Sequence, residues 1–80
     1  MAVKLVFLGK LADLAGVPER EIAAPLDWAG LLKSLEPALA AQAAGEKVRI
    51  ALNGGLLTDK PSLSARDGDE IALLPPVSGG

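Results

Sequence analysis

Residues 70–76, Glu70-Ile71-Ala72-Leu73-Leu74-Pro75-Pro76, form an apolar segment that ends at two prolines. Its composition and alternation predict a β-strand in which Ile71 and Leu73 face the core, while Ala72 and Leu74 face the opposite side. Proline fixes φ and has no amide donor, so the ladder of hydrogen bonds must stop at or just after Leu74. We therefore predict a last strand over residues 70–74, followed by an extended segment.

The opening of the chain predicts a first strand of the same kind. Residues 3–8 alternate around one lysine, so Val3, Leu5 and Phe7 would face the core. Lys4, Val6 and Leu8 would then face the other side. The segment after it, residues 10–14, fits either a short helical turn or a wide loop.

Further strands are predicted over residues 19–24, which end at Pro25, and over residues 48–52. Asn53-Gly54-Gly55 is a strong turn signal because Asn and Gly tolerate positive φ, so residues 56–59 should form a short returning strand. The segment 60–65 is expected to be an irregular connection with Leu63 directed into the core.

A helix is predicted after Asp27, which is a suitable N-cap. Its apolar stripe has the i, i+3, i+4, i+7 spacing of a core-facing helix and consists of Trp28, Leu31, Leu32 and Leu35. We interpret Trp28 as part of the core. Pro37 should end this helix near Glu36 or start a second one, over residues 38–44, that Gly45 closes.

This order of elements predicts an α+β domain with a main helix packed across one face of a mixed sheet of four to five strands. The first and last strands should be parallel neighbours in the middle of that sheet. We assign residues 1–75 to one domain and residues 76–80 to an extended tail.

Composition excludes several classes of function. The 80 residues include no cysteine and no histidine, which argues against disulfides, zinc sites, thiol or imidazole catalysis and catalytic triads. A net charge of −2 without a basic cluster argues against nucleic acid and anionic membranes as partners. Lys4 interrupts an apolar run too short for a signal peptide, and no run could span a bilayer, so we expect a cytoplasmic protein.

Two short motifs do not support the sites they suggest. Gly9-Lys10 lacks the upstream glycine and the following Ser or Thr of a phosphate loop. Asp67-Gly68-Asp69 resembles the start of a calcium loop, but the ligand pattern does not continue. We interpret it as a solvated turn and predict no metal site.

The last six residues, Pro75-Pro76-Val77-Ser78-Gly79-Gly80, favour an extended spacer. The stretch from Pro76 to Gly80 can reach about 15 Å. Glycine has no Cβ, so Gly79 and Gly80 would suit a narrow site in a partner. Our hypothesis is that the carboxyl of Gly80 is the functional group and that the domain presents it.

If the helix covers one face of the sheet, the other face carries apolar side chains. These are Val6, Leu8, Ala72 and Leu74, with Leu56 nearby. An apolar patch of this size on a small domain is typical of a partner site. We predict that Leu8, Leu56 and Leu74 contact a partner.

The motifs at both ends resemble one family. The segment from Asp67 to Ala72, leading into the Pro-Pro-Val-Ser-Gly-Gly tail, is similar to the C-terminus of the small, sulfur-carrier subunit of molybdopterin synthase, MoaD. The opening Val-x-Leu-Val-Phe and the Leu-Ala-x-Leu-Ala-Gly segment are similar too. The resemblance spans the chain and implies a ubiquitin-like β-grasp fold.

The resemblance also implies a chemistry for Gly80. An E1-like partner would use ATP to adenylate its carboxyl, and a persulfide donor would supply sulfur to leave a thiocarboxylate. The tail, Pro75 to Gly79 included, would then enter the large subunit of molybdopterin synthase, in a heterotetramer, and deliver sulfur to cyclic pyranopterin monophosphate. The chain itself would be no enzyme and would bind no cofactor.

Three alternatives stay open. A sulfur carrier for thiamin synthesis also ends in Gly-Gly but typically lacks the two prolines. A ubiquitin-like modifier would be conjugated to lysines through Gly80. A plain interaction domain would keep its function without Gly79 and Gly80.

Overall fold

The main sheet is mixed, as the sequence predicts. The structure, a computed structural model, describes residues 1–76, and within them five strands form this sheet in the order β2-β1-β7-β4-β5. β1 and β7 are parallel neighbours, and the other pairs are antiparallel. The strands are β1 (Ala2–Phe7), β2 (Glu19–Ala23), β4 (Arg49–Leu52), β5 (Gly55–Leu56) and β7 (Glu70–Leu74).

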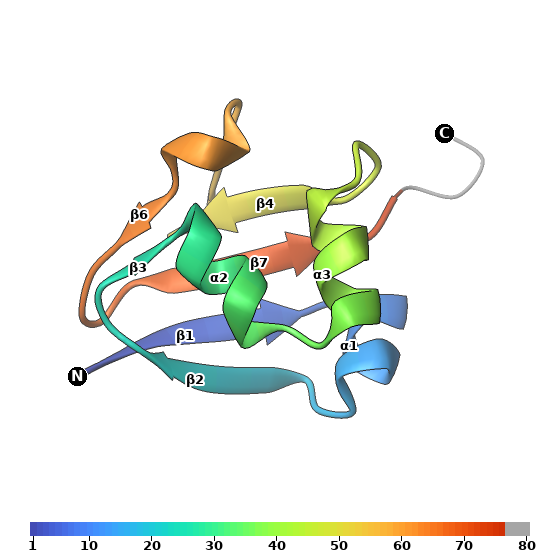
Figure 1. Cartoon of the computed structure of the whole chain (residues 1–80), viewed down its shortest axis with the longest axis horizontal. Helices are drawn as coiled ribbons and strands as arrows, with labels where there is room; N and C mark the ends of the chain where they lie inside the picture. The colour runs from blue at the N-terminus through green and yellow to red at the C-terminus, as the bar shows by residue number, and fades with distance from the viewer. Residues whose placement is uncertain (77–80) are drawn as a thin grey trace.

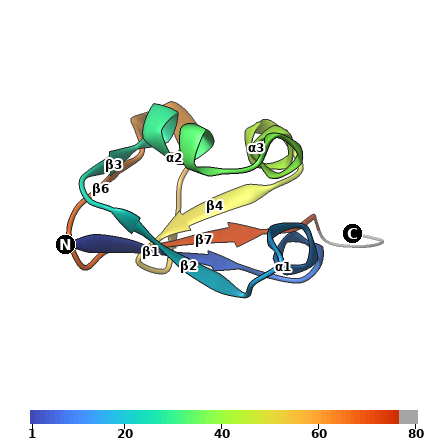
Figure 2. The same cartoon turned by 60° about the horizontal axis from the view of Figure 1, so that its bottom comes forward.

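Helices α2 (Trp28–Ser34) and α3 (Pro37–Ala44) cover one face of this sheet (Figure 1; Figure 2). The Asp27 side chain accepts a hydrogen bond of 2.8 Å from the amide of Gly30, which confirms the predicted N-cap. Pro37 occupies the start of α3, so the main helical segment is broken there into two short helices. Trp28 is half-buried and packs against the core, as predicted.

The segment after β1 forms helix α1 (Lys10–Ala15), the first of the two alternatives left open by the sequence. α1 contacts both β1 and α3 and lies near the end of the sheet where β1 and β7 finish (Figure 1). Its Leu11 is 2% exposed and belongs to the core. This helix therefore closes the core at the end from which the tail leaves.

The core is aliphatic, apart from Phe7. The predicted inward residues of the central strands are all buried, at 2% exposure or less: Val3, Leu5, Phe7, Ile71 and Leu73. They meet Leu31 of α2, Leu39 of α3 and Leu63, whose burial confirms the predicted direction of this side chain. The sequence thus predicted correctly which side chains of β1 and β7 face the core. The prediction of an irregular connection over residues 60–65 was wrong, because residues 60–62 form a 3₁₀ turn and residues 64–65 a short strand.

The connections differ from the prediction in two places. Asn53 and Gly54 form a two-residue turn with φ of 50° and 86°, so Gly55 already belongs to β5, which ends at Leu56 instead of Asp59. β5 is short because a 3₁₀ turn, η1 (Lys60–Ser62), carries the chain away from the sheet edge. Within residues 1–76 a second sheet, which was not predicted from the sequence, also forms from β3 (Leu26–Asp27) and β6 (Ser64–Ala65).

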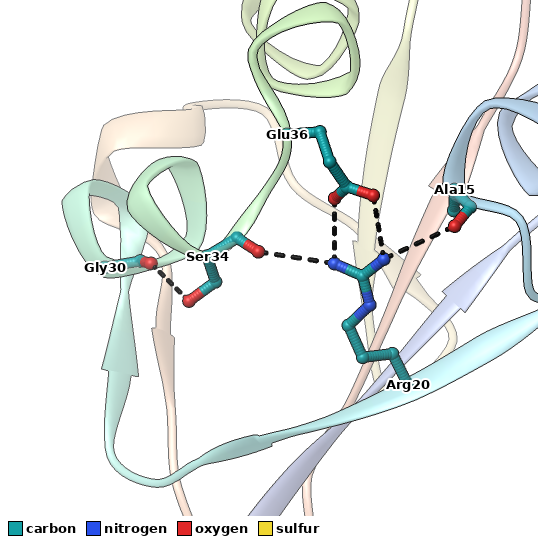
Figure 3. A network of polar contacts seen from close by, with 5 residues as sticks. All are labelled: Ala15, Arg20, Gly30, Ser34 and Glu36. Atoms are coloured by element: carbon teal, nitrogen blue, oxygen red, sulfur yellow. Dashed lines mark hydrogen bonds and ion pairs between the residues drawn. The ribbon is translucent and has the colours of Figure 1, made fainter.

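Arg20 ties the edge strand β2 to the helices (Figure 3). Its guanidinium donates to both carboxylate oxygens of Glu36, at 3.0 and 3.2 Å, and to the carbonyls of Ser34 and Ala15, at 3.3 and 3.5 Å. It also lies 5.5 Å from the centre of the Phe7 ring. The hydrogen bonds from Arg20 lower the pKa of Glu36.

We predict that Arg20→Met lowers the free energy of unfolding by about 1 kcal/mol at neutral pH, since methionine keeps the apolar stem but loses the hydrogen bonds. Because the folded-state pKa of Glu36 is lowered, its contribution exists above the unfolded pKa and is lost as the pH falls through the folded value. The difference between wild type and variant should therefore shrink in acid. Urea unfolding at about pH 7 and about pH 3 measures it, and a constant difference would contradict this role for Arg20.

Candidate functional site

The root of the tail lies at the end of the central strand β7. The amide of Leu8 donates to the carbonyl of Leu73 at 3.3 Å, and the strand ends at Leu74. Pro75 is half-buried and Pro76 is exposed. The predicted site residues Val77, Ser78, Gly79 and Gly80 lie outside the described residues, so their assigned roles stay predictions.

A groove borders this root. It has a volume of about 940 Å³ and is lined by the first turns of α1, by Gln42 of α3, and by Pro75 and Pro76. Most of the exposed lining is apolar, with Lys10 and Asp13 as charged residues at its margin. The described tail root is therefore a wall of a groove built by two helices, a feature that the sequence analysis did not predict.

The face of the sheet opposite α2 and α3, called here the open face, carries a row of apolar residues. Val6 pairs with Ala72, Ala72 pairs with Ala51, and Ala51 pairs with Leu56, so the row crosses four strands. Leu74 is half-buried on the same face of β7, opposite Arg49. The expected apolar row is thus formed, and Ala51 joins it.

The predicted contact residues differ in exposure. Leu56 is 60% exposed and Leu8, directly after β1, is 41% exposed. Leu74 offers less surface because it is half-buried. Exposed leucines at this level are compatible with a contact surface, and the burial of Leu74 limits its share of such a contact.

Charged residues flank the apolar row on the side of β1 and β2. Lys4 pairs in the sheet with Glu21 on one side and Glu70 on the other, and its ammonium lies 3.3 Å from the carboxylate of Glu19. Lys4 thus has an ion pair with Glu19 and two glutamates as its neighbours in the sheet. The open face combines an apolar row with an acidic margin.

Asp67 and Asp69 serve the turn before β7. The Asp67 carboxylate accepts from the amide of Ala2 at 2.9 Å, and the Asp69 carboxylate accepts from the amide of Arg66 at 2.8 Å and from the Asn53 amide group at 3.1 Å. These bonds lower the pKa of Asp69, the bond from Arg66 most of all. Across residues 1–76, no group of three His, Cys, Asp or Glu residues could hold a metal ion. The Asp-Gly-Asp motif is structural.

In the described part of the chain, no polar or charged side chain is fully buried. Lys60 is partly buried: desolvation lowers the pKa of its ammonium, which donates to the carbonyls of Ala43 and Gly45 at 2.8 and 2.6 Å. Within that same part, no helix combines the length and apolarity needed to cross a membrane.

Comparisons with known proteins agree with this geometry. The family model described as ThiS family matches residues 5–80. The chain is 32% identical to a molybdopterin synthase sulfur carrier subunit from Chlamydomonas reinhardtii, over the full length of both.

Two solved structures have the same fold. One is small archaeal modifier protein 1 from Methanosarcina acetivorans, with 29% identity, a TM-score of 0.79, and coverage of 99% of this chain and 96% of that one. The other is in a complex of subunits 1 and 2 of the molybdopterin-converting factor from Helicobacter pylori, with 32% identity, a TM-score of 0.66 and full coverage of both chains. The ubiquitin-like β-grasp fold is thus confirmed, and the chain belongs to the ThiS family, the ThiS/MoaD group of β-grasp sulfur carriers.

Proposed function

We propose that this chain is the sulfur carrier of molybdopterin synthase and that the carboxyl of Gly80 is its working group. The 32% identity with the Chlamydomonas carrier subunit carries the proposal, since that match covers the full length of both chains. The geometry supports it, because the described tail root, Pro75 and Pro76, follows directly from a central strand.

The chemistry requires activation of a poor electrophile. In the proposed sequence the carboxylate of Gly80 attacks the α-phosphorus of ATP, pyrophosphate leaves, and an acyl adenylate forms in an E1-like partner. A persulfide sulfur then displaces AMP, and a thiol cleaves the donor's S–S bond to leave a thiocarboxylate. The tail delivers this sulfur to cyclic pyranopterin monophosphate in the large subunit.

The partners must supply the catalytic groups. The sequence has no cysteine or histidine, and residues 1–76 bury no titratable side chain. Activation of nucleophiles and stabilisation of developing charge are therefore assigned to the activating enzyme and the large subunit. We propose that ATP is bound by the activating enzyme and that this chain binds no cofactor.

The open face is the proposed contact with the large subunit, through Leu8, Leu56 and Leu74. The Helicobacter relative, whose structure is a complex of the two subunits, supports a partner of this kind. We further propose a heterotetramer of two small and two large subunits.

We predict that the wild-type chain gains about 16 Da, one oxygen replaced by sulfur, on incubation with ATP, a sulfide or persulfide source and its activating enzyme. Gly80→Ala should slow this gain at least about tenfold, because a side chain at the reacting residue obstructs a narrow site. Intact-mass spectrometry measures both. Sulfur loading of the variant at the wild-type rate would contradict the proposal.

A second prediction concerns the open face. Leu56→Glu should weaken binding of the large subunit at least about tenfold, because it places a charge in a desolvated contact. Since Leu56 is 60% exposed, the free energy of unfolding should change by less than about 0.5 kcal/mol. Calorimetric titration measures the affinity.

Val17→Glu is the matched control, since Val17 is also exposed, at 39%, but lies between α1 and β2 instead of on the open face. This variant should bind like the wild type. If both substitutions weaken binding of the large subunit equally, the added charge acts regardless of its place on the surface, and the proposed contact through the open face is contradicted.

A protein modifier is the second candidate function, because the chain is also similar to small archaeal modifier protein 1. In that case Gly80 would form amide bonds with substrate lysines, and blots of cell extract would show a ladder of heavier adducts. A thiamin-type carrier is disfavoured by Pro75 and Pro76, which such carriers typically lack. A single band on the blot together with the mass gain would favour the carrier over the modifier.

A further inference from the structure

The tail root contacts one backbone segment of the body. Gly9 joins β1 to α1 with φ of 56° and ψ of −130°. A Cβ built on Gly9 would lie 3.2 Å from Cγ of Pro75, which is tighter than most real Cβ contacts. The backbone at Gly9 therefore packs directly against the ring of the first tail proline.

The segment that touches Pro75 is held in place on both sides. Before it, the amide of Leu8 donates to the carbonyl of Leu73 at 3.3 Å. After it, the carbonyls of Leu8 and Gly9 each accept an amide hydrogen bond of 3.1 Å from the first turn of α1, from Leu11 and Ala12. Leu11 is buried in the core, so α1 cannot shift without disturbing the packing. The segment is thus a fixed wall beside the tail.

From this contact we propose that Gly9 is a positioning residue that, through Pro75, sets the direction in which the chain leaves the body at Pro76. The inference rests on the proposed function for its significance, because direction matters only if Gly80 must reach a partner's site. The ring of Pro75 already fixes φ, and the Gly9 wall limits where that ring can lie. Gly9 takes no part in the chemistry, and it acts only through its contact with Pro75.

The size of the effect follows from distance. Residues 77–80 can span at most about 13 Å, so the direction of the chain at Pro76 decides which part of a partner's site the carboxyl can reach. A misplacement of about 1 Å can cost about 100-fold in rate. Adding one methyl group at Gly9, which requires Pro75 to move by a few tenths of an ångström, should therefore slow the reaction of the carboxyl in a partner's site, adenylation included.

The direct test measures the tail without any partner. The sequence has one tryptophan and no cysteine, so Ser78→Cys with a fluorescent acceptor gives a single donor–acceptor pair with Trp28. Time-resolved energy transfer then gives the distribution of distances. Pro75→Ala should broaden this distribution clearly more than Pro76→Ala, because both remove one stiffening ring but, of the two prolines, only Pro75 lies within 4 Å of the Gly9 Cβ position. Equal broadening by the two variants would overturn the inference.

The functional test uses the unlabelled chain with its activating enzyme. Gly9→Ala should lower kcat for adenylation about tenfold or more with an unchanged KM, since docking of the body is intact while the carboxyl is misplaced. Gly16→Ala is the control: Gly16 also has positive φ, 79°, but among residues 1–76, its chain neighbours aside, no atom lies within 4 Å of where its Cβ would be. It should lower thermal stability and leave both kinetic constants unchanged.

The experiments distinguish failure of the proposed function from failure of the positioning role of Gly9. If wild type is never adenylated, the proposed function fails, while the distance distributions still test the role of Gly9. If wild type is adenylated and Gly9→Ala matches it in kcat, or if Gly16→Ala falls equally, the positioning role is wrong and the carrier function stands. A lower kcat in Gly9→Ala alone supports both.

Discussion

The parallel pairing of β1 with β7 is the interaction on which this structure depends. It brings residues from the two ends of the chain together, Leu5 beside Ile71 and Phe7 beside Leu73, in the middle of the main sheet. All four side chains are 2% exposed or less. Closing so long a loop costs entropy that local contacts cannot offset, so the buried apolar area of these two strands must offset it. The helices, the edge strands and the second sheet are added around this pair.

This pairing explains how a small domain can present a chain end. Terminal residues are normally the least ordered part of a domain, but here Pro75 follows a strand with neighbours on both sides. The described domain has an apolar core, and the tail root follows directly from a strand within it. Under the proposed function, the chemistry is left to partners.

Much of the fold could be predicted from the sequence because the signals are local. Alternation gives the parity of β1 and β7, Asp27 and Pro37 mark helix starts, and Asn53-Gly54 marks a turn. The strands β3 and β6 were missed because two residues, such as Leu26 and Asp27, are too few to show a period. The contacts of Arg20 with the helices were not predicted, although the alternation of β2 contains a signal for them. Ile22 packs against the core, so Arg20, two residues before it, lies on the same, helix-covered face of the sheet.

The candidate site could be predicted only in part. The apolar row on the open face followed from strand parity, and the exposure of Leu8 and Leu56 agrees with it. The reduced exposure of Leu74 could not be foreseen, because it depends on neighbours from other strands. The contact of Gly9 with Pro75 joins residues 66 positions apart, and no pattern in a single sequence reports such a distant packing. A glycine between a strand and a helix was the one local signal.

Native-state amide hydrogen exchange tests the central claim, that the tail is rooted in the most stable part of the domain. If the pairing of β1 with β7 holds the fold together, the hydrogen-bonded amides of both strands exchange only through global unfolding, at one common and slowest rate. The amides of β5 and of the short second sheet should exchange sooner. If the amides of β7 exchange well before those of β4, the tail is attached to a strand that opens locally, and this account of the fold is contradicted.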